Sequence, residues 1–258
     1  MMNGQIYEIF SSFQGEGVHV GRRQVFVRMA GCPLNCCYCD TPLSKKDSPL
    51  CRAEQHASTS DFELIRNPIE VNDLIPQIRN LMTSDAKAVS YTGGEPLLQE
   101  EFLYSIADRC RRNGWKNYLD TSGFSARRFR KVVNVIDYAA IDVKLPDHQA
   151  VIAEDYSKLY ANEISCIEVS CDNCAETIIK VVILPGTDVE YFTKVCKDIR
   201  SIVENTSAEL YFVIQPVTLM GEMSQSFTKE IFELSERAGS YLKEVRVIPQ
   251  VHKIIGIQ

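Results

Sequence analysis

Three cysteines stand close together in a short loop and have the spacing of metal ligands. Cys32, Cys36 and Cys39 form a C-x3-C-x2-C pattern in the segment 30–41, directly after an apolar, β-rich run. Three thiolates can hold three irons of a cubane 4Fe-4S cluster and leave the fourth iron open to a small molecule. Zinc is the alternative, since structural zinc takes four protein ligands and catalytic zinc takes three with a water. The spacing favours the cluster and leaves zinc open.

Further reactive groups follow the next three β-rich runs. The Gly-Gly-Glu-Pro segment at 93–96 offers two glycines that let a backbone approach a ligand, and a carboxylate that could accept from an ammonium group. Thr121 and Ser122 follow the next run, and Asp142 and Lys144 follow the one after. Taken alone, each of these is as much expected in a turn, a helix cap or a surface ion pair.

The elements that must position these groups alternate between β-rich runs and helical patterns, which predicts parallel strands joined by crossover helices. About six β/α steps are too few for an eightfold barrel and suit a partial barrel or a doubly wound sheet, both of which bind ligands at the carboxyl ends of strands. The predicted strands are Gln5 to Phe10, Gln24 to Met29, Ala88 to Thr92, Asn117 to Thr121, Tyr138 to Asp142, Ile178 to Leu184, Leu210 to Gln215 and Glu244 to Ile248. The predicted helices are Val71 to Met82, Glu100 to Asn113, Ala126 to Val135, Val189 to Glu204 and Thr228 to Leu242, and Pro42 to Pro68 is predicted to be a loop or a small inserted helix.

Composition narrows the class of protein. The chain has 258 residues, a formal net charge of −6 and 45% hydrophobic residues, values typical of a globular protein. The acidic balance gives no general attraction to nucleic acid, and no apolar run approaches the roughly 18 residues of a membrane span. Because no secretory signal is recognisable, we expect a cytoplasmic protein whose ten cysteines are reduced, with no nucleic-acid or membrane partner.

The cysteine loop resembles that of the radical S-adenosylmethionine enzymes, and the aromatic residue before the last cysteine, Tyr38, also fits. The resemblance implies an α/β fold, a partial (β/α)6 TIM-like barrel. It also implies that the free iron binds S-adenosylmethionine, which the reduced cluster cleaves to a 5′-deoxyadenosyl radical, so that no protein side chain is assigned as catalytic. The cofactor-binding residues it implies are Tyr38, Asp40, Gly93, Gly94, Glu95, Thr121, Ser122, Asp142, Val143 and Lys144.

Within that superfamily, the run from Ile9 to Thr41 resembles the 7-carboxy-7-deazaguanine synthase family, whose Gln-Gly-Glu-Gly segment matches residues 14–17. The substrate this implies is 6-carboxy-5,6,7,8-tetrahydropterin, a flat heterocycle with one carboxylate. Glu16 could accept from its guanidine-like edge, and the Arg28 fork could hold its carboxylate. Thr41 matches a family position that binds Mg²⁺. The implied substrate-binding residues are Phe13, Gln14, Gly15, Glu16, Arg28, Thr92, Gln215, His252 and Gln258.

The resemblance also carries expectations about organisation and partners. It implies a single radical S-adenosylmethionine domain over 1–258, with the cluster loop at 30–41, a variable insertion at about 42–69 and a segment capping the substrate at about 244–258. The reaction would abstract hydrogen from C6, contract the ring and release ammonia, in the pathway to queuosine or archaeosine precursors. An electron donor such as flavodoxin or ferredoxin and a homodimer are the expected partners.

Some residues depart from the family pattern. Cys37 lies between two proposed ligands, and Cys166, Cys171 and Cys174 form a second group, predicted to be thiols on a surface loop, with an auxiliary metal site as the alternative. The Asp142–Lys144 segment is closer to the Asp-x-Lys of glycyl-radical-enzyme activases. Such an activase is therefore the alternative function, followed by a non-catalytic zinc or iron-sulfur binding module.

Replacing Cys36 by alanine should abolish cluster assembly and turnover together, because no spare ligand is positioned to replace it. Iron and sulfide analysis after anaerobic reconstitution, combined with an activity assay, measures both effects. A variant that kept its cluster and full activity would show that another set of cysteines binds the iron.

Overall fold

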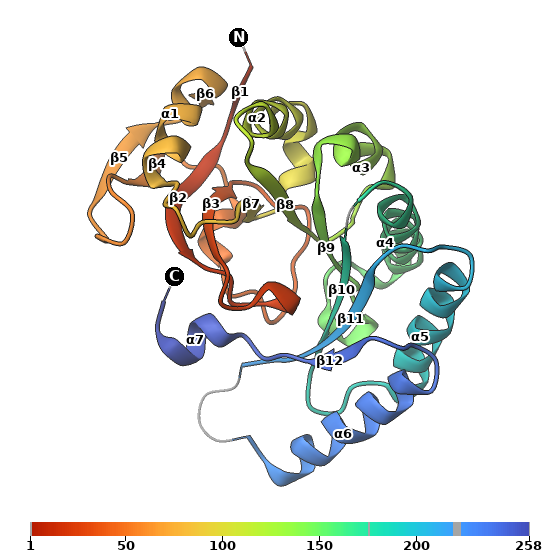
Figure 1. The fold of residues 1–258 in the computed structure, drawn as a ribbon. Helices are drawn as coiled ribbons and strands as arrows, with labels where there is room; N and C mark the ends of the chain where they lie inside the picture. Colours follow the sequence, from red (N-terminus) through yellow and green to blue (C-terminus); the bar gives the residue numbers. More distant parts are fainter. Residues whose placement is uncertain (1, 175, 219–222, 258) are drawn as a thin grey trace.

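The computed structural model describes residues 2–174, 176–218 and 223–257, which form a large curved sheet with helices along its outer side (Figure 1). The strands are β1 (Asn3–Gly4), β2 (Ile6–Phe13), β3 (Arg23–Met29), β4 (Leu50–Glu54), β5 (Phe62–Arg66), β6 (Ile69–Glu70), β7 (Ala88–Gly93), β8 (Lys116–Thr121), β9 (Tyr138–Asp142), β10 (Glu176–Ile183), β11 (Leu210–Pro216) and β12 (Val245–Val247). The helices are α1 (Val71–Leu81), α2 (Glu100–Arg112), α3 (Ala126–Val132), α4 (Ala153–Asn173), α5 (Val189–Val203), α6 (Gln225–Gly239) and α7 (Val251–Ile255). Short 3-10 turns are η1 (Gly17–His19), η2 (Pro42–Lys45), η3 (Pro96–Gln99), η4 (Val133–Val135) and η5 (Pro146–His148).

The main sheet of the described chain has ten strands in the order β12-β11-β10-β9-β8-β7-β3-β2-β4-β5. The strands from β3 through β7 to β12 are parallel, whereas β2 runs antiparallel to β3. Strands β12 and β5 form the two edges, so the barrel is not closed. Helices α2 to α6 follow the outer side of the parallel strands in Figure 1, as in a partial barrel, whereas a doubly wound sheet has helices on both faces. The predicted α/β partial barrel is confirmed.

Apolar residues fill both sides of the parallel strands. The larger core lies between the sheet and the helices, where α1 buries Leu74, Ile75 and Ile78 at the three- and four-residue spacing of one helix face. A smaller cluster on the opposite, inner face contains Tyr118 and Ile178 together with Ala88, Ala140 and Val213. Because side chains alternate along a strand, the residues two positions further along β8 and β10 face the same interior. The inner face therefore leads directly to the carboxyl ends of the strands.

All the predicted strands and helices are present, with shifts of a few residues at their ends. Helix α6 begins at Gln225 rather than Thr228, because the Ser224 side chain caps it by accepting from the Phe227 amide at 3.2 Å.

Two predictions about connecting segments are wrong. The segment Pro42 to Pro68, predicted to be a loop or a small helix, contains η2 and the strands β4 and β5, and β4 extends the sheet by pairing with β2. The predicted surface loop that carries Cys166 and Cys171 is helix α4, where both thiols are buried, and Cys174 caps its end. Polar residues interrupt the apolar pattern of α4, which concealed the helix in the sequence.

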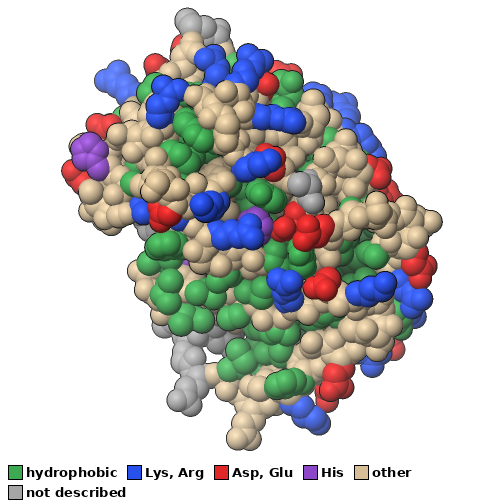
Figure 2. Space-filling view, in the orientation of Figure 1, with side chains coloured by type: hydrophobic (Ala, Val, Ile, Leu, Met, Phe, Trp, Pro, Cys, Tyr) green, Lys and Arg blue, Asp and Glu red, His purple; other side chains and the backbone are tan. Residues whose placement is uncertain are grey.

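Charged side chains of both signs are interspersed over the face drawn in Figure 2, and apolar side chains gather in its lower part. In the described part of the chain, no helix is both long and apolar enough to cross a membrane.

Buried Asn117 joins three elements of the core. Its Nδ2 donates to the carbonyl oxygens of Ala107, at 2.9 Å, and Val135, at 2.8 Å, and its Oδ1 accepts from the Tyr91 hydroxyl at 2.9 Å. We expect Asn117→Ala to lower the free energy of unfolding by about 3 kcal/mol, because these buried groups lose their partner. Urea denaturation measures the change. The control is Asn205→Ala, because Asn205 is exposed and its Nδ2 donates to the Ser201 carbonyl, at the end of the same helix, at 2.7 Å. An equal loss of unfolding free energy in both variants would contradict the role of Asn117.

Candidate active site

A cavity of about 350 Å³ opens at the carboxyl ends of the parallel strands. Its walls come from the cysteine loop, the turns after β2, β7, β8 and β9, and the segment before and within α7. The sequence-predicted residues that line it are Phe13, Gln14, Gly15, Glu16, Arg28, Cys32, Cys36, Tyr38, Cys39, Asp40, Thr41, Thr92, Gly93, Gly94, Thr121, Ser122, Asp142, Lys144, Gln215 and His252. Residues from both ends of the chain thus share one cavity.

The three cysteines of the C-x3-C-x2-C pattern all face this cavity and are partly buried. Burial is the main cause that raises the pKa of Cys32 to about 11, and the charges of Glu95 and of the nearby Cys36 and Cys39 contribute to that rise. Cys37 is exposed and lies outside the cavity wall, with its Sγ 3.7 Å from the Asp147 carbonyl oxygen. The loop therefore directs three of its four cysteines inward.

The separation of these thiols tests the kind of metal group that they fit. Zinc–sulfur bonds of about 2.3 Å require the donor atoms of one ion to lie within about 4.6 Å of one another. Among the described residues, Glu16, Asp40 and His252 form a group of three whose donor atoms all lie within 4.8 Å of one another. The three cysteines form no such group. The three thiols are thus not gathered around a single ion, and three soft sulfur ligands are the donor set of a cubane cluster.

The Gly-Gly-Glu turn after β7 packs backbone to backbone on the start of the cysteine loop. The amide of Gly94 donates to the Met29 carbonyl at 3.0 Å, and the amide of Glu95 donates to the Gly31 carbonyl at 2.7 Å. A Cβ atom on Gly94 would lie 2.0 Å from that Gly31 oxygen. Only glycine fits at this contact, which sets the position of the loop against the sheet.

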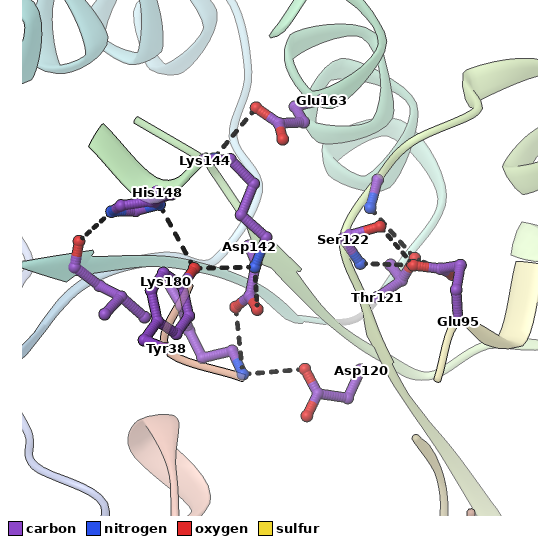
Figure 3. Close-up of polar contacts among 12 residues, drawn as sticks. Tyr38, Glu95, Asp120, Thr121, Ser122, Asp142, Lys144, His148, Glu163 and Lys180 are labelled. Atoms are coloured by element: carbon purple, nitrogen blue, oxygen red, sulfur yellow. Dashed lines mark hydrogen bonds and ion pairs between the residues drawn. The ribbon is translucent and has the colours of Figure 1, made fainter. Parts of the chain in front are cut away.

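Glu95 faces the protein rather than the cavity. Its buried carboxylate accepts from the Leu97 amide at 2.9 Å, the Thr121 hydroxyl at 2.6 Å and the Ser122 amide at 2.8 Å (Figure 3). Burial raises its pKa, although these hydrogen bonds oppose the shift. Glu95 therefore ties the end of β7 to the end of β8.

Two other predicted residues do not line the cavity either. Val143 is buried, and its amide donates to the Lys180 carbonyl at 2.8 Å. Gln258 lies outside the described residues.

A buried cluster of ion pairs forms the floor of the cavity. The ammonium group of Lys180, on β10, lies 2.8 Å from Glu16. It also lies 2.9 Å from Asp120 and 3.2 Å from Asp142, and Lys144 lies 2.9 Å from Asp142 (Figure 3). Burial, together with the charges of Asp142 and Glu16, raises the pKa of Asp120 to about 6, against the opposing effect of Lys180. Sequence reasoning missed Lys180 and Asp120. A lysine inside the apolar run 178–184 was the available signal, because a buried lysine requires acidic partners.

Lys144 also reaches the cysteine loop. Its Nζ donates to the Tyr38 hydroxyl at 3.2 Å, and that hydroxyl lies 3.3 Å from Nδ1 of His148 (Figure 3). Burial and the charge of Lys144 lower the pKa of His148 to about 3, so the imidazole is neutral. Its Nδ1 accepts from the Leu145 amide at 3.0 Å, and its Nε2 donates to the Val182 carbonyl at 2.9 Å. Nothing in the sequence pattern pointed to His148.

The segment before α7 covers the cavity from the other side. Gln250 Nε2 donates to Glu16 at 2.8 Å and to Asp40 at 3.0 Å, and the Val251 amide donates to the Gly15 carbonyl at 2.8 Å. A Cβ atom on Gly15 would lie 2.3 Å from the His252 ring. The glycine-rich segment and the chain's last described residues are therefore in direct contact.

Comparisons with known proteins agree with this geometry. Residues 13–164 match the family model described as a 4Fe-4S single cluster domain. The chain is 37% identical to the 7-carboxy-7-deazaguanine synthase of Methanocaldococcus jannaschii over 98% of this chain and 99% of the relative. The chain belongs to the 7-carboxy-7-deazaguanine synthase family. It is also 31% identical to the synthase of Geobacter sulfurreducens, over 98% of this chain and 97% of that one.

Solved structures support the fold of this synthase family member. It matches the crystal structure of QueE from Escherichia coli with a TM-score of 0.57 at 19% identity, covering 98% of this chain and 96% of that one. It matches a radical SAM methyltransferase from Sphaerobacter thermophilus with the same TM-score at 10% identity, covering 88% and 66%. The chain is an enzyme of the radical S-adenosylmethionine type with a 4Fe-4S cluster, and the family assignment favours a synthase over a glycyl-radical activase or a non-catalytic module.

Replacing Gly94 by alanine should disrupt cluster assembly, because the new methyl group would meet the Gly31 carbonyl oxygen and push the cysteine loop away from β7. We expect a loss of bound iron and sulfide and a destabilisation of about 3 kcal/mol, as for overpacking in a core. Gly239→Ala is the matched control, because a Cβ atom there meets nothing within 4 Å. Iron content equal in both variants would contradict the proposed contact.

Proposed function

We propose that this enzyme converts 6-carboxy-5,6,7,8-tetrahydropterin to 7-carboxy-7-deazaguanine by abstraction of hydrogen from C6, radical ring contraction and loss of ammonia. The product would be a precursor of 7-deazapurines such as queuosine or archaeosine. The observation that carries the proposal is the near full-length similarity to named synthases, at 31% to 37% identity for the two described above. The chemistry of the cavity wall supports it independently.

That wall contains groups complementary to a flat, anionic heterocycle. Nε of Arg28 is held by Glu8 at 2.7 Å at the cavity wall, where the guanidinium would bind the substrate carboxylate. Glu16 would accept from the guanidine-like edge of the ring. Oε1 of Gln215 is buried and has no hydrogen-bond partner within the described chain, so it is available to accept from a ring N–H. Phe13 and Thr92 would complete the substrate contacts.

The cofactor groups fit the neighbouring wall. Cys32, Cys36 and Cys39 would hold the cluster, which with S-adenosylmethionine supplies the radical when bound. The buried pair of Lys144 and Asp142, which lies beside Tyr38, would contact the polar part of S-adenosylmethionine. The turn at 93–94 and the hydroxyls of Thr121 and Ser122 would complete the contacts with S-adenosylmethionine. The substrate would then lie between the cofactor and the segment 250–252.

Thr41 supports a proposal for Mg²⁺. It lines the cavity beside Asp40, and its side chain makes no capping hydrogen bond to η2, so its hydroxyl is free to bind an ion that also contacts the substrate carboxylate. The Asp40 carboxylate, whose pKa the side chains of His252 and Lys253 lower against the effect of burial, would attract the ion.

Several further features belong to the same proposal. They are a single radical S-adenosylmethionine domain over 1–258, a flavodoxin or ferredoxin as electron donor, a homodimer, and a cytoplasmic location in which the ten cysteines stay as thiols.

Anaerobically reconstituted enzyme, given dithionite, S-adenosylmethionine and the carboxytetrahydropterin, should form a product with the mass of 7-carboxy-7-deazaguanine, the substrate less ammonia. The Cys36→Ala variant is the control and should form none. Cleavage of S-adenosylmethionine without this product, under conditions in which the substrate is present in excess, would overturn the proposed substrate.

A further inference from the structure

Lys180 binds three carboxylates that reach it from three separate parts of the chain. It lies on β10 and is 2% exposed. Glu16 comes from the turn after β2. Asp120 comes from β8 and Asp142 from the end of β9 (Figure 3). No sequence motif includes Lys180, and the family resemblance gave it no role.

Neighbouring strands fix the position of Lys180. It is in register with Asp142 on β9, and it faces the inner side of the sheet, two residues beyond Ile178 of the inner apolar cluster. Although burial opposes it, Asp120, Asp142 and Glu16 raise the pKa of Lys180, so the ammonium group stays charged. A charge buried this deeply is stable only while its partners stay in place.

Glu16, in contrast, lies in a turn between β2 and η1 and depends on other elements for its orientation. One carboxylate oxygen accepts from Lys180 at 2.8 Å, and the other accepts from Gln250 at 2.8 Å. Gln250 belongs to the short segment before α7, whereas Lys180 belongs to a strand in the interior of the sheet. Lys180 is therefore the rigid support of the Glu16 carboxylate.

We propose that Lys180 is a positioning residue that aims the Glu16 carboxylate at the paired N–H groups of the substrate ring, and so sets the enzyme's preference for 2-amino heterocycles. The inference rests on the proposed function. Each carboxylate oxygen has two lone pairs, so one on each stays free for the ring N–H and the exocyclic amino group after Lys180 and Gln250 have donated. An analogue with oxygen in place of the amino group presents an acceptor to Glu16 and is rejected.

Removing the ammonium group would leave Glu16, Asp120 and Asp142 close together in a buried site, where Lys144 is the remaining cation paired with them in the described part of the chain. Repulsion would turn Glu16 away from the substrate, because Glu16 lies in a turn whereas Asp120 and Asp142 lie on strands. We therefore expect Lys180→Met to raise the substrate Kd and KM roughly tenfold to a hundredfold, the loss of one charge-assisted hydrogen bond, with little change in kcat. Binding of the 2-oxo analogue should change much less.

A double-mutant cycle separates positioning from general damage. If Lys180 acts through Glu16, then Lys180→Met should add little to the KM increase caused by Glu16→Gln, because the two residues act as one unit. Lys116→Met is the matched control, since Lys116 also forms an ion pair on a strand of the sheet, at 2.6 Å from Asp137, but on the exposed side. Its KM should equal that of the parent enzyme.

Binding is measured on the cluster-loaded protein by calorimetry, and turnover by mass spectrometry. If Lys180→Met does not fold, the charge-balanced Lys180→Met/Asp120→Asn variant replaces it and should show a smaller rise in KM, because Glu16 still lacks its support while one source of repulsion is removed. An unchanged KM in a folded variant, or an effect of the same size with Glu16→Gln present, would overturn the inference. A parent enzyme that neither binds nor converts the carboxytetrahydropterin would instead overturn the proposed function, so the two failures are distinguishable.

Discussion

The ion pairs around Lys180 and Lys144 are the constraint on which the rest of the site depends. Burying a charge costs several kcal/mol unless it is paired, so the two ammonium groups fix where Glu16, Asp120 and Asp142 must lie. These pairs connect β8, β9 and β10 to the turn after β2. Through Tyr38, which accepts from Lys144, they also reach the cysteine loop. One network thus joins the side of the cavity proposed for the cofactor to the side proposed for the substrate.

A second contact, between uncharged backbone groups, sets the position of the cysteine loop relative to the end of β7. Gly94 meets the Gly31 carbonyl so closely that no side chain fits between them. Glu95 then draws the turn after β8 toward the turn after β7 through Thr121 and Ser122. The sequence suggested that Glu95 binds a ligand. In the structure its carboxylate instead accepts hydrogen bonds from other residues of the protein. Its carboxylate maintains the shape of the site by holding two strand ends at a fixed separation.

The two ends of the chain close the cavity together. The segment before α7 lies across the glycine-rich turn at 14–17, and Gln250 bridges Glu16 and Asp40. Because the same carboxylates face the cavity, this segment contributes both a wall and hydrogen-bond donors. The absence of a side chain at Gly15 permits this approach, since the His252 ring occupies the space where a Cβ atom would lie.

The sequence by itself determined the alternation of strands and helices, the parallel strands and the loop that carries the cysteines, and it left a partial barrel and a doubly wound sheet open. Each of these depends on local periodicity or on short spacing, so a single segment contains the whole signal. It also indicated Thr121, Ser122, Asp142 and Lys144, since groups that follow parallel strands must meet at one end of the sheet, whereas the family resemblance indicated most of the other residues around the cavity. Only the tertiary structure decided that Cys37 points outward, that Glu95 faces inward, and that Lys180, Asp120 and His148 belong to the site. Those outcomes depend on which side chains, far apart in the sequence, meet in the same buried space. Contacts across the sheet produce no periodic pattern in the sequence that could predict them. Helix α4 was missed for a related reason, because its packing against neighbouring elements outweighs an irregular apolar pattern.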